Sequence, residues 1–238
     1  MRICITNDDG VHAKGLCVLA EWAKKLGDVT IFAPAVQQSG KSHSIEIHTP
    51  YRVEKVEHRT GLRAYQVYST PADCVRVAMM AMDEDFDLVF SGINHGYNLG
   101  REITYSGTVG AALEAGIQGA NAIALSTGRD KFTGIEKHLD AMWDYFQANG
   151  LFTAAPVWNV NIPEECAGKI VLAKQGGAFY SDTFFLKEGH ASVEGKLVWQ
   201  PGNDMTADTD AVLQYGHIAL TPLTNDCTND DAFEMLKK

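Results

Sequence analysis

Apolar residues along this chain fall into short runs, separated by segments in which they recur at helical spacing. Short apolar runs bounded by turn-forming residues are typical of buried strands, and recurrence every three or four residues is typical of amphipathic helices. The expected strands are residues 1–6, 29–33, 88–90, 122–125 and 157–161, and the expected helices are residues 14–26, 70–82, 108–116 and 135–149. This alternation predicts an α/β fold, with a mostly parallel, right-handed sheet and helices on both faces.

Two segments depart from this alternation. In residues 44–69, apolar and polar residues alternate around a turn at Thr60 and Gly61, which predicts an antiparallel β-hairpin insertion. After residue 169 strands and a hairpin dominate. The expected elements there are strands at 170–173, 184–186, 193–199 and 217–220 and a short C-terminal helix. We therefore divide the chain into an α/β core at 1–170 and a C-terminal extension at 171–238.

Composition limits the classes of partner. The 238 residues are 45% hydrophobic, which is ample for a core. Lys and Arg number 20 against 30 Asp and Glu, and the net charge of -10 argues against general binding of nucleic-acid polymers or anionic membranes. The five cysteines are odd in number and show no CxxC spacing, which favours reduced thiols. Without a signal peptide or a membrane-length apolar run, we expect a soluble, cytoplasmic protein.

Two adjacent carboxylates, Asp8 and Asp9, follow the first expected strand directly. The carboxyl ends of strands are where open α/β sheets bind ligands. Paired carboxylates there indicate a bound cation, and Gly10 lets the backbone turn away sharply. The alternative is a solvated turn, because Asn-Asp-Asp-Gly at 7–10 is also good turn chemistry.

Three further loops are expected at the same edge of the sheet, at 38–42, 91–100 and 105–108. Their candidate ligands are oxygen donors, which favour magnesium, manganese or calcium over zinc or copper. The Ser-Gly-Thr sequence at 106–108 opens a helix, so its backbone N–H groups suit a phosphate, although the same residues could serve only as a helix cap. A divalent cation beside a phosphate cradle is the minimum equipment for hydrolysing a phosphomonoester.

Residues 35–42 are similar to a phosphate-binding P-loop, but Ala35 stands where the first glycine is required. The segment also follows the second expected strand rather than the first, and Pro34 interrupts it. A P-loop NTPase is therefore not expected.

Several motifs, in the same order and at compatible spacing, resemble the SurE family of stationary-phase survival nucleotidases. They are Asn-Asp-Asp-Gly at 7–10, Gln-Ser-Gly at 38–40, Thr-Pro-Ala-Asp-Cys-Val at 70–75, Ser-Gly-Ile-Asn-His-Gly at 91–96 with Asn98 and Gly100, Tyr-Ser-Gly-Thr-Val at 105–109, Asn-Val-Asn-Ile-Pro at 159–163, Asp-Thr-Asp at 208–210 and Thr-Pro-Leu at 221–223. The resemblance implies a metal-dependent 5'-nucleotidase that acts on nucleoside monophosphates, with possible activity on 3'-nucleotides and short polyphosphate.

The resemblance also implies roles for particular residues. One divalent ion per subunit, manganese or magnesium, would be held by Asp8, Asp9, Ser39 and Asn94. The phosphate would be held by Asn98, Ser106, Gly107 and Thr108, and Asp8, Asp9 and Asn94 would be catalytic. The implied fold is a Rossmann-like three-layer sandwich, with a C-terminal segment exchanged between subunits in homodimers or homotetramers.

Two other functions remain as alternatives. A haloacid-dehalogenase-type phosphatase uses an aspartyl nucleophile, but its two key aspartates normally stand two residues apart, whereas Asp8 and Asp9 are adjacent. A catalytically silent nucleotide-binding module would need only the phosphate cradle, so the full set of oxygen ligands argues against it. The role of His95, which lies within the 91–100 loop, is left open.

Overall fold

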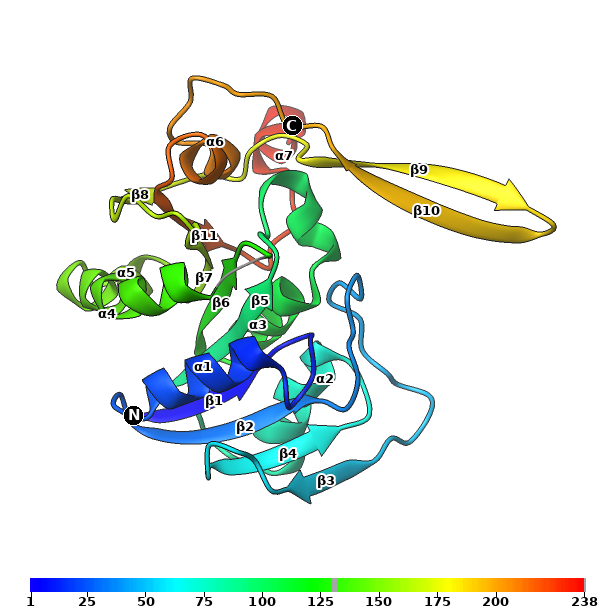
Figure 1. Cartoon of the computed structure of the whole chain (residues 1–238), viewed down its shortest axis with the longest axis vertical. Coiled ribbons are helices and arrows are strands. Elements are labelled where there is room, and N and C mark those ends of the chain that lie inside the picture. Colours follow the sequence, from blue (N-terminus) through cyan, green and yellow to red (C-terminus); the bar gives the residue numbers. More distant parts are fainter. Residues whose placement is uncertain (130–131, 238) are drawn as a thin grey trace.

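A mostly parallel sheet of nine strands forms the centre of the computed structural model, which describes residues 1–129 and 132–237 (Figure 1). Its strands are β1 (Arg2–Thr6), β2 (Asp28–Pro34), β3 (Val53–Val56), β4 (Arg63–Val67), β5 (Leu88–His95), β6 (Asn121–Thr127), β7 (Val157–Asn161), β8 (Ile170–Leu172) and β11 (Ile218–Leu223). Their order in the sheet is β3-β4-β2-β1-β5-β6-β7-β11-β8, and β3–β4 and β7–β11 are the antiparallel pairs.

Helices cover both faces of this sheet. They are α1 (Lys14–Ala23), α2 (Pro71–Arg76) with a π-helical continuation (Val77–Ala81), a 3-10 helix (Gly100–Tyr105), α3 (Gly107–Ile117), α4 (Thr133–Ala148), α5 (Leu151–Ala154), α6 (Asp208–Leu213) and α7 (Asp230–Leu236). Helices α1 and α4 pack on one face and α2 and α3 on the other. The predicted three-layer α/β fold is confirmed, and no helix in the described part of the chain is long and apolar enough to cross a bilayer.

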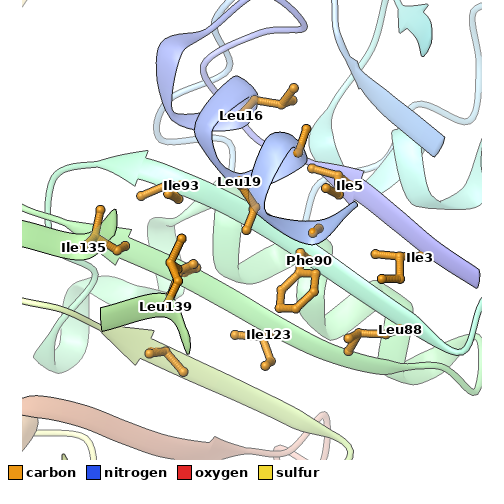
Figure 2. Packing of buried hydrophobic residues seen from close by; sticks show 14 of the residues in the cluster. Ile3, Ile5, Leu16, Leu19, Leu88, Phe90, Ile93, Ile123, Ile135 and Leu139 are labelled. Carbon is orange, nitrogen blue, oxygen red and sulfur yellow. The ribbon is translucent and has the colours of Figure 1, made fainter. Parts of the chain in front are cut away.

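Each central strand contributes to two hydrophobic cores because successive side chains point to opposite faces of a sheet. In β1, Ile3 and Ile5 join the core under α1 and α4, whereas Cys4 joins the core under α2 and α3. Figure 2 shows the first core, in which Leu16 and Leu19 of α1 lie over β1 and β5. Burial on both faces explains why these strands appear in the sequence as nearly continuous apolar runs.

Two elements differ from the expectation. The strand predicted at 88–90 continues to His95, because it stays paired with β6 over its whole length. A register shift between Gly92 and Asn94 absorbs the irregularity, and His95 still lies opposite Thr127. The hairpin predicted within 44–69 is antiparallel, as expected. Its strand β4, however, pairs in parallel with β2, so the hairpin extends the main sheet instead of standing apart.

The C-terminal part of the chain is divided between the sheet and a projecting ribbon. Strands β8 and β11 lie in the main sheet beyond β7. Strands β9 (Tyr180–Lys187) and β10 (His190–Leu197) form a separate two-stranded hairpin that extends away from the body (Figure 1). Helix α6 was not expected from the sequence.

Gly15 allows α1 to approach β5 closely just before the candidate ligand Asn94. A Cβ atom at this position would lie 2.1 Å from the carbonyl oxygen of Ile93. Alanine normally favours a helix over glycine by about 1 kcal/mol. Here we expect Gly15→Ala to reduce the free energy of unfolding by about 1–3 kcal/mol, because the backbone of β5 must shift. Urea denaturation measures this change, and a more stable variant would contradict the proposed close contact.

Candidate active site

A polar cavity of about 500 Å³ lies at the carboxyl ends of β1 and β5. These strands pair in parallel with Thr6 opposite Ser91, so the loops that follow them leave the sheet at the same edge. Six of the eight predicted site residues line the cavity: Asp8, Asp9, Ser39, Asn94, Asn98 and Ser106. The structure therefore brings together residues that are up to 98 positions apart in the chain.

The remaining two predicted residues, Gly107 and Thr108, lie behind Asp8 in the first turn of α3. The Thr108 hydroxyl donates a 2.6 Å hydrogen bond to Asp8 Oδ1. A Cβ atom on Gly107 would lie 3.1 Å from the Cβ of Asp8, so the helix start packs directly on this side chain. Asp8 is only 4% exposed. Burial raises the pKa of Asp8 to about 6, although the Thr108 hydroxyl opposes the shift.

Gln37 connects the second carboxylate to the loop that follows β2. Its side-chain nitrogen lies 3.4 Å from Asp9 Oδ1 and donates a 2.9 Å hydrogen bond to the Ser39 hydroxyl oxygen. Burial also raises the pKa of Asp9, whereas a backbone hydrogen bond from His95 lowers it. The Gln38 backbone N–H donates to the Asp8 carbonyl at 2.7 Å, which holds this loop beside the two carboxylates.

The same loop is fixed to α3 through a buried carboxylate. His43 Nε2 lies 2.7 Å from Glu114 Oε2, and Arg76 Nη1 lies 3.2 Å from Glu114 Oε1. A Cβ on Gly110 would lie 2.4 Å from the Ser42 carbonyl oxygen, so the loop rests on the helix backbone. Burial favours a higher pKa for Glu114, but hydrogen bonds from His43 and Gln118 and the Arg76 charge outweigh it, and the pKa is lowered. Ser39 therefore stands on a loop anchored at both ends.

Asn94 and Asn98 are held by amide hydrogen bonds. The Asn94 side-chain nitrogen donates to the Gly96 carbonyl at 2.8 Å, which leaves its amide oxygen available as a ligand. The Asn98 side-chain nitrogen donates to the Ser126 hydroxyl at 2.9 Å. The side-chain nitrogens of Asn159 and Asn161 both donate to the Asn98 carbonyl, at 2.9 and 2.8 Å. These contacts fix the 91–100 loop against the ends of β6 and β7.

The donor set fits a hard divalent cation. It consists of two carboxylates, one hydroxyl and one amide oxygen, on Asp8, Asp9, Ser39 and Asn94, all of which line one cavity. Magnesium and manganese prefer such ligands and complete their coordination with water or substrate oxygens. Only two of these four residues, Asp8 and Asp9, are of the His, Cys, Asp or Glu types. Among the described residues, no group of three or more side chains of those types could hold a metal ion.

The cavity is also lined by residues to which the sequence assigned no role. They are Gln37, Gly40, His95, Gly96, Tyr97, Glu102, Tyr105 and Arg129. Asn159 and Asn161 were noticed only within a motif, and their contact with Asn98 depends on β7 lying beside β6.

Ser106 also caps α3, since its hydroxyl oxygen accepts from the Val109 N–H at 3.1 Å. The His95 ring stacks on Phe132, with 5.4 Å between ring centroids.

The fold and this site define an α/β protein with a cavity lined by oxygen-bearing side chains at the edge of a mostly parallel sheet. Residues 3–182 match the model of the survival protein SurE family. The chain is 38% identical to the 5'-nucleotidase SurE of Thermoanaerobacter sp. (strain X514), over 99% of this chain and 97% of that protein. It is 36% identical to the 5'-nucleotidase SurE of Rhodopirellula baltica, over 100% of this chain and 98% of that protein.

The solved structure of the SurE protein from Aquifex aeolicus is similar over 100% of this chain and 98% of that chain, with a TM-score of 0.82 and 30% sequence identity. The chain therefore belongs to the SurE family, whose members are in general metal-dependent. The family predicted from the sequence motifs is confirmed.

Glu114 provides a test of how the Ser39 loop is held. Its pKa is lowered in the folded state, so its ionised form stabilises the protein at neutral pH, and this contribution is lost as the pH falls below the ordinary carboxyl range. We expect Glu114→Gln to lower the free energy of unfolding by about 2–4 kcal/mol at pH 7, because Arg76 and His43 lose a buried partner. The difference from the wild type should shrink as the pH falls below about 4.

Denaturant titrations at several pH values measure this dependence. Glu234→Gln is the matched control, because Glu234 is exposed and pairs only with Lys237 three residues away among the described contacts. Its expected effect is within about 0.5 kcal/mol. An equal loss at pH 7 and pH 3 for Glu114→Gln would show that the ionised carboxylate does not anchor the loop.

Proposed function

We propose that this protein is a metal-dependent phosphomonoesterase that hydrolyses nucleoside 5'-monophosphates to nucleoside and phosphate. The observation that carries the proposal is the gathering of Asp8, Asp9, Ser39 and Asn94 in one cavity beside the start of α3. The names of its relatives, 5'-nucleotidases of the SurE family, support the same activity. The proposal includes 3'-nucleotides and short polyphosphate as secondary substrates.

One divalent ion per subunit, manganese or magnesium, is proposed to bind to Asp8, Asp9, Ser39 and Asn94. When bound, such an ion polarises phosphoryl oxygens and lowers the pKa of a coordinated water. Asp8 is buried and fixed by Thr108, so it is suited to hold a constant position. Asp9 is more exposed and is suited to orient the attacking water and to accept its proton.

The phosphate is proposed to lie between the cation ligands and Ser106, with Asn98 at the side of the cavity. The backbone N–H groups at the start of α3 would favour the charge that develops on the phosphoryl oxygens, because they form the positive end of the helix dipole. Arg129 adds one positive side chain to the cavity wall. No covalent intermediate is required by this arrangement.

Metal dependence and the role of Asp8 can be tested together. Purified, metal-stripped protein is assayed for phosphate release from a panel of nucleoside monophosphates, with manganese, magnesium or no metal added. We expect release only with metal, and we expect Asp8→Asn to reduce kcat by at least about 100-fold, because a central charged ligand is lost. Circular dichroism and denaturation establish that the variant is folded.

The outcomes distinguish the proposal from its alternatives. Turnover by Asp8→Asn near the wild-type rate at saturating metal would contradict the proposed ligand set. Tight nucleotide binding without turnover in any metal would favour the silent binding module. A phosphoaspartate trapped on Asp8 or Asp9 would favour the haloacid-dehalogenase-type mechanism.

We also propose that the protein is a homo-oligomer, a dimer or a tetramer, built through the segment 171–238. The β9–β10 hairpin carries exposed apolar side chains, with Phe184 70% and Leu186 80% exposed. Helix α7 likewise exposes 69% of Leu236. Exposed large apolar side chains that gather on one element are typical of protein interfaces. The five cysteines, all described and none in a disulfide, support a reducing, cytoplasmic location.

The role of the hairpin in assembly predicts the effect of two substitutions. We expect the double variant Phe184→Ser and Leu186→Ser to shift the protein towards monomers, because about 25 cal/mol per Å² of apolar burial is lost at the interface. Light scattering coupled to size-exclusion chromatography measures the mass in solution. A monomeric wild type, or an unchanged assembly in a folded variant, would contradict the proposed role of the hairpin.

A further inference from the structure

Two buried asparagines interrupt the apolar pattern of β7. Residues 157–162 are all buried, and Asn159 and Asn161 are the two polar residues among them. Val157 faces the core under α2 and α3, so both asparagines, two and four positions further on, point to the same face of the sheet. Asparagine is disfavoured in strands, and burying its amide costs free energy unless the amide is bonded. Such a departure from the local pattern is expected where a residue serves a site.

The Asn161 side chain bonds to both backbone groups of Asn98. The Asn98 N–H donates to Asn161 Oδ1 at 2.9 Å, and Asn161 Nδ2 donates to the Asn98 carbonyl at 2.8 Å. Asn159 Nδ2 donates to the same carbonyl at 2.9 Å, so both acceptor positions of this oxygen are used. Asn98 lies outside the strands and helices, yet one side-chain amide pairs with it as a neighbouring strand would.

The side chain of Asn98 is fixed from the same row of the sheet. Its Nδ2 donates to the hydroxyl of Ser126 at 2.9 Å, and Ser126 lies opposite Asn161 in the pairing of β6 with β7. Ser126 is fully buried, so this contact is shielded from water. The backbone N–H, the carbonyl and one amide N–H of Asn98 are thus engaged. Its amide oxygen and second amide N–H are left to meet a ligand in the polar cavity that Asn98 lines.

We infer that Asn161 is a positioning residue that holds Asn98 in the orientation in which its side-chain amide meets the substrate phosphate, and that Asn159 supports the same contact. The inference rests on the proposed function, in which Asn98 lies beside the phosphate. Neither asparagine is among the described residues that line the polar cavity, so both act through Asn98. The role requires a donor and an acceptor on one short side chain, which asparagine provides.

The two asparagines are not equivalent. Asn161 uses both its amide oxygen and its amide nitrogen on Asn98. Asn159 uses only its nitrogen, and its buried amide oxygen has no hydrogen-bond partner among the described residues. Loss of Asn161 would leave the Asn98 N–H without its acceptor and the carbonyl with one donor, whereas loss of Asn159 would remove only one of two donors. The effect of Asn161 should therefore be the larger.

The test measures phosphate binding and cation binding separately. We expect Asn161→Leu to raise the KM for AMP and the inhibition constant of orthophosphate by about tenfold, because two hydrogen bonds that position Asn98 are lost. The change in kcat should be below about threefold, since a contact made equally in the ground state and the transition state appears in KM. Asn159→Leu should raise both constants by only about two- to threefold.

The affinity for Mn²⁺ separates positioning of Asn98 from a general loosening of the site. Calorimetry without substrate should give a Kd for Mn²⁺ within about twofold of the wild type in each variant, because the asparagines bond to Asn98 and not to the proposed cation ligands among the described contacts. Asn161→Ser, whose side chain is too short to reach both backbone groups, is the second variant should Asn161→Leu fail to fold.

Asn149→Leu is the matched control. Asn149 is exposed at the end of α4, its side-chain nitrogen donates to the Tyr145 carbonyl, and it does not line the polar cavity. All its constants should equal those of the wild type. An unchanged orthophosphate constant in a folded Asn161 variant would overturn the inference. An equal loss of orthophosphate and Mn²⁺ affinity would also overturn it, because the effect would then not be specific to Asn98.

Failure of the proposed function gives a different result. In that case the wild type hydrolyses AMP with none of the metals. Calorimetric binding of orthophosphate to the Mn²⁺-loaded wild type and variants then decides the inference on its own. The Kd for orthophosphate should rise by about tenfold in Asn161→Leu and remain unchanged in Asn149→Leu. Equal binding by the wild type and Asn161→Leu, or no binding by the wild type, would overturn the role of Asn161.

Discussion

The contact between Asp8 and the start of α3 is the interaction on which the site depends. A carboxylate that is almost fully buried needs a hydrogen-bond donor, and the Thr108 hydroxyl supplies one at 2.6 Å. The close approach is possible because Gly107 has no side chain to hold the helix away. The backbone of Asp8 also accepts from Gln38, so the same residue positions the loop that carries Ser39. One buried acid thus connects β1, α3 and the loop after β2.

The charges around the cavity indicate what the proposed cation would supply. The chain carries a net charge of -10, and Asp8, Asp9 and Glu102 all line the cavity. Among the described residues that line it, Arg129 alone is a Lys or Arg. A phosphate dianion would meet a repulsive field there without compensation. Burial raises the pKa of both Asp8 and Asp9, and the neighbouring charge of Asp9 adds to the shift of Asp8. A divalent ion would relieve the repulsion between the two acids and attract the substrate.

The sequence predicted the elements whose signal is local. Apolar periodicity identified the central strands and α1 to α4, and the rule that ligands bind at strand ends placed Asp8, Asp9 and Asn94 at one edge. What it missed depends on contacts between distant segments. Nothing near Asn159 or Asn161 in the chain reveals that both hold Asn98, because that contact requires β7 to lie beside β6. The continuation of β5 to His95 depends in the same way on pairing with β6.

The C-terminal segment takes part in building the cavity wall, although it begins where the strand–helix alternation ends. Both carboxylate oxygens of Asp208 in α6 accept from the Gly100 N–H at 3.1 Å, and one also accepts from Gly176 at 2.9 Å. The Gln175 side chain donates to the Gly100 carbonyl at 2.9 Å. Gly100 opens the 3-10 helix that carries Glu102 and leads to Ser106. A boundary near residue 170 therefore separates two patterns in the sequence, but the geometry of the 100–106 segment depends on residues from both sides of it.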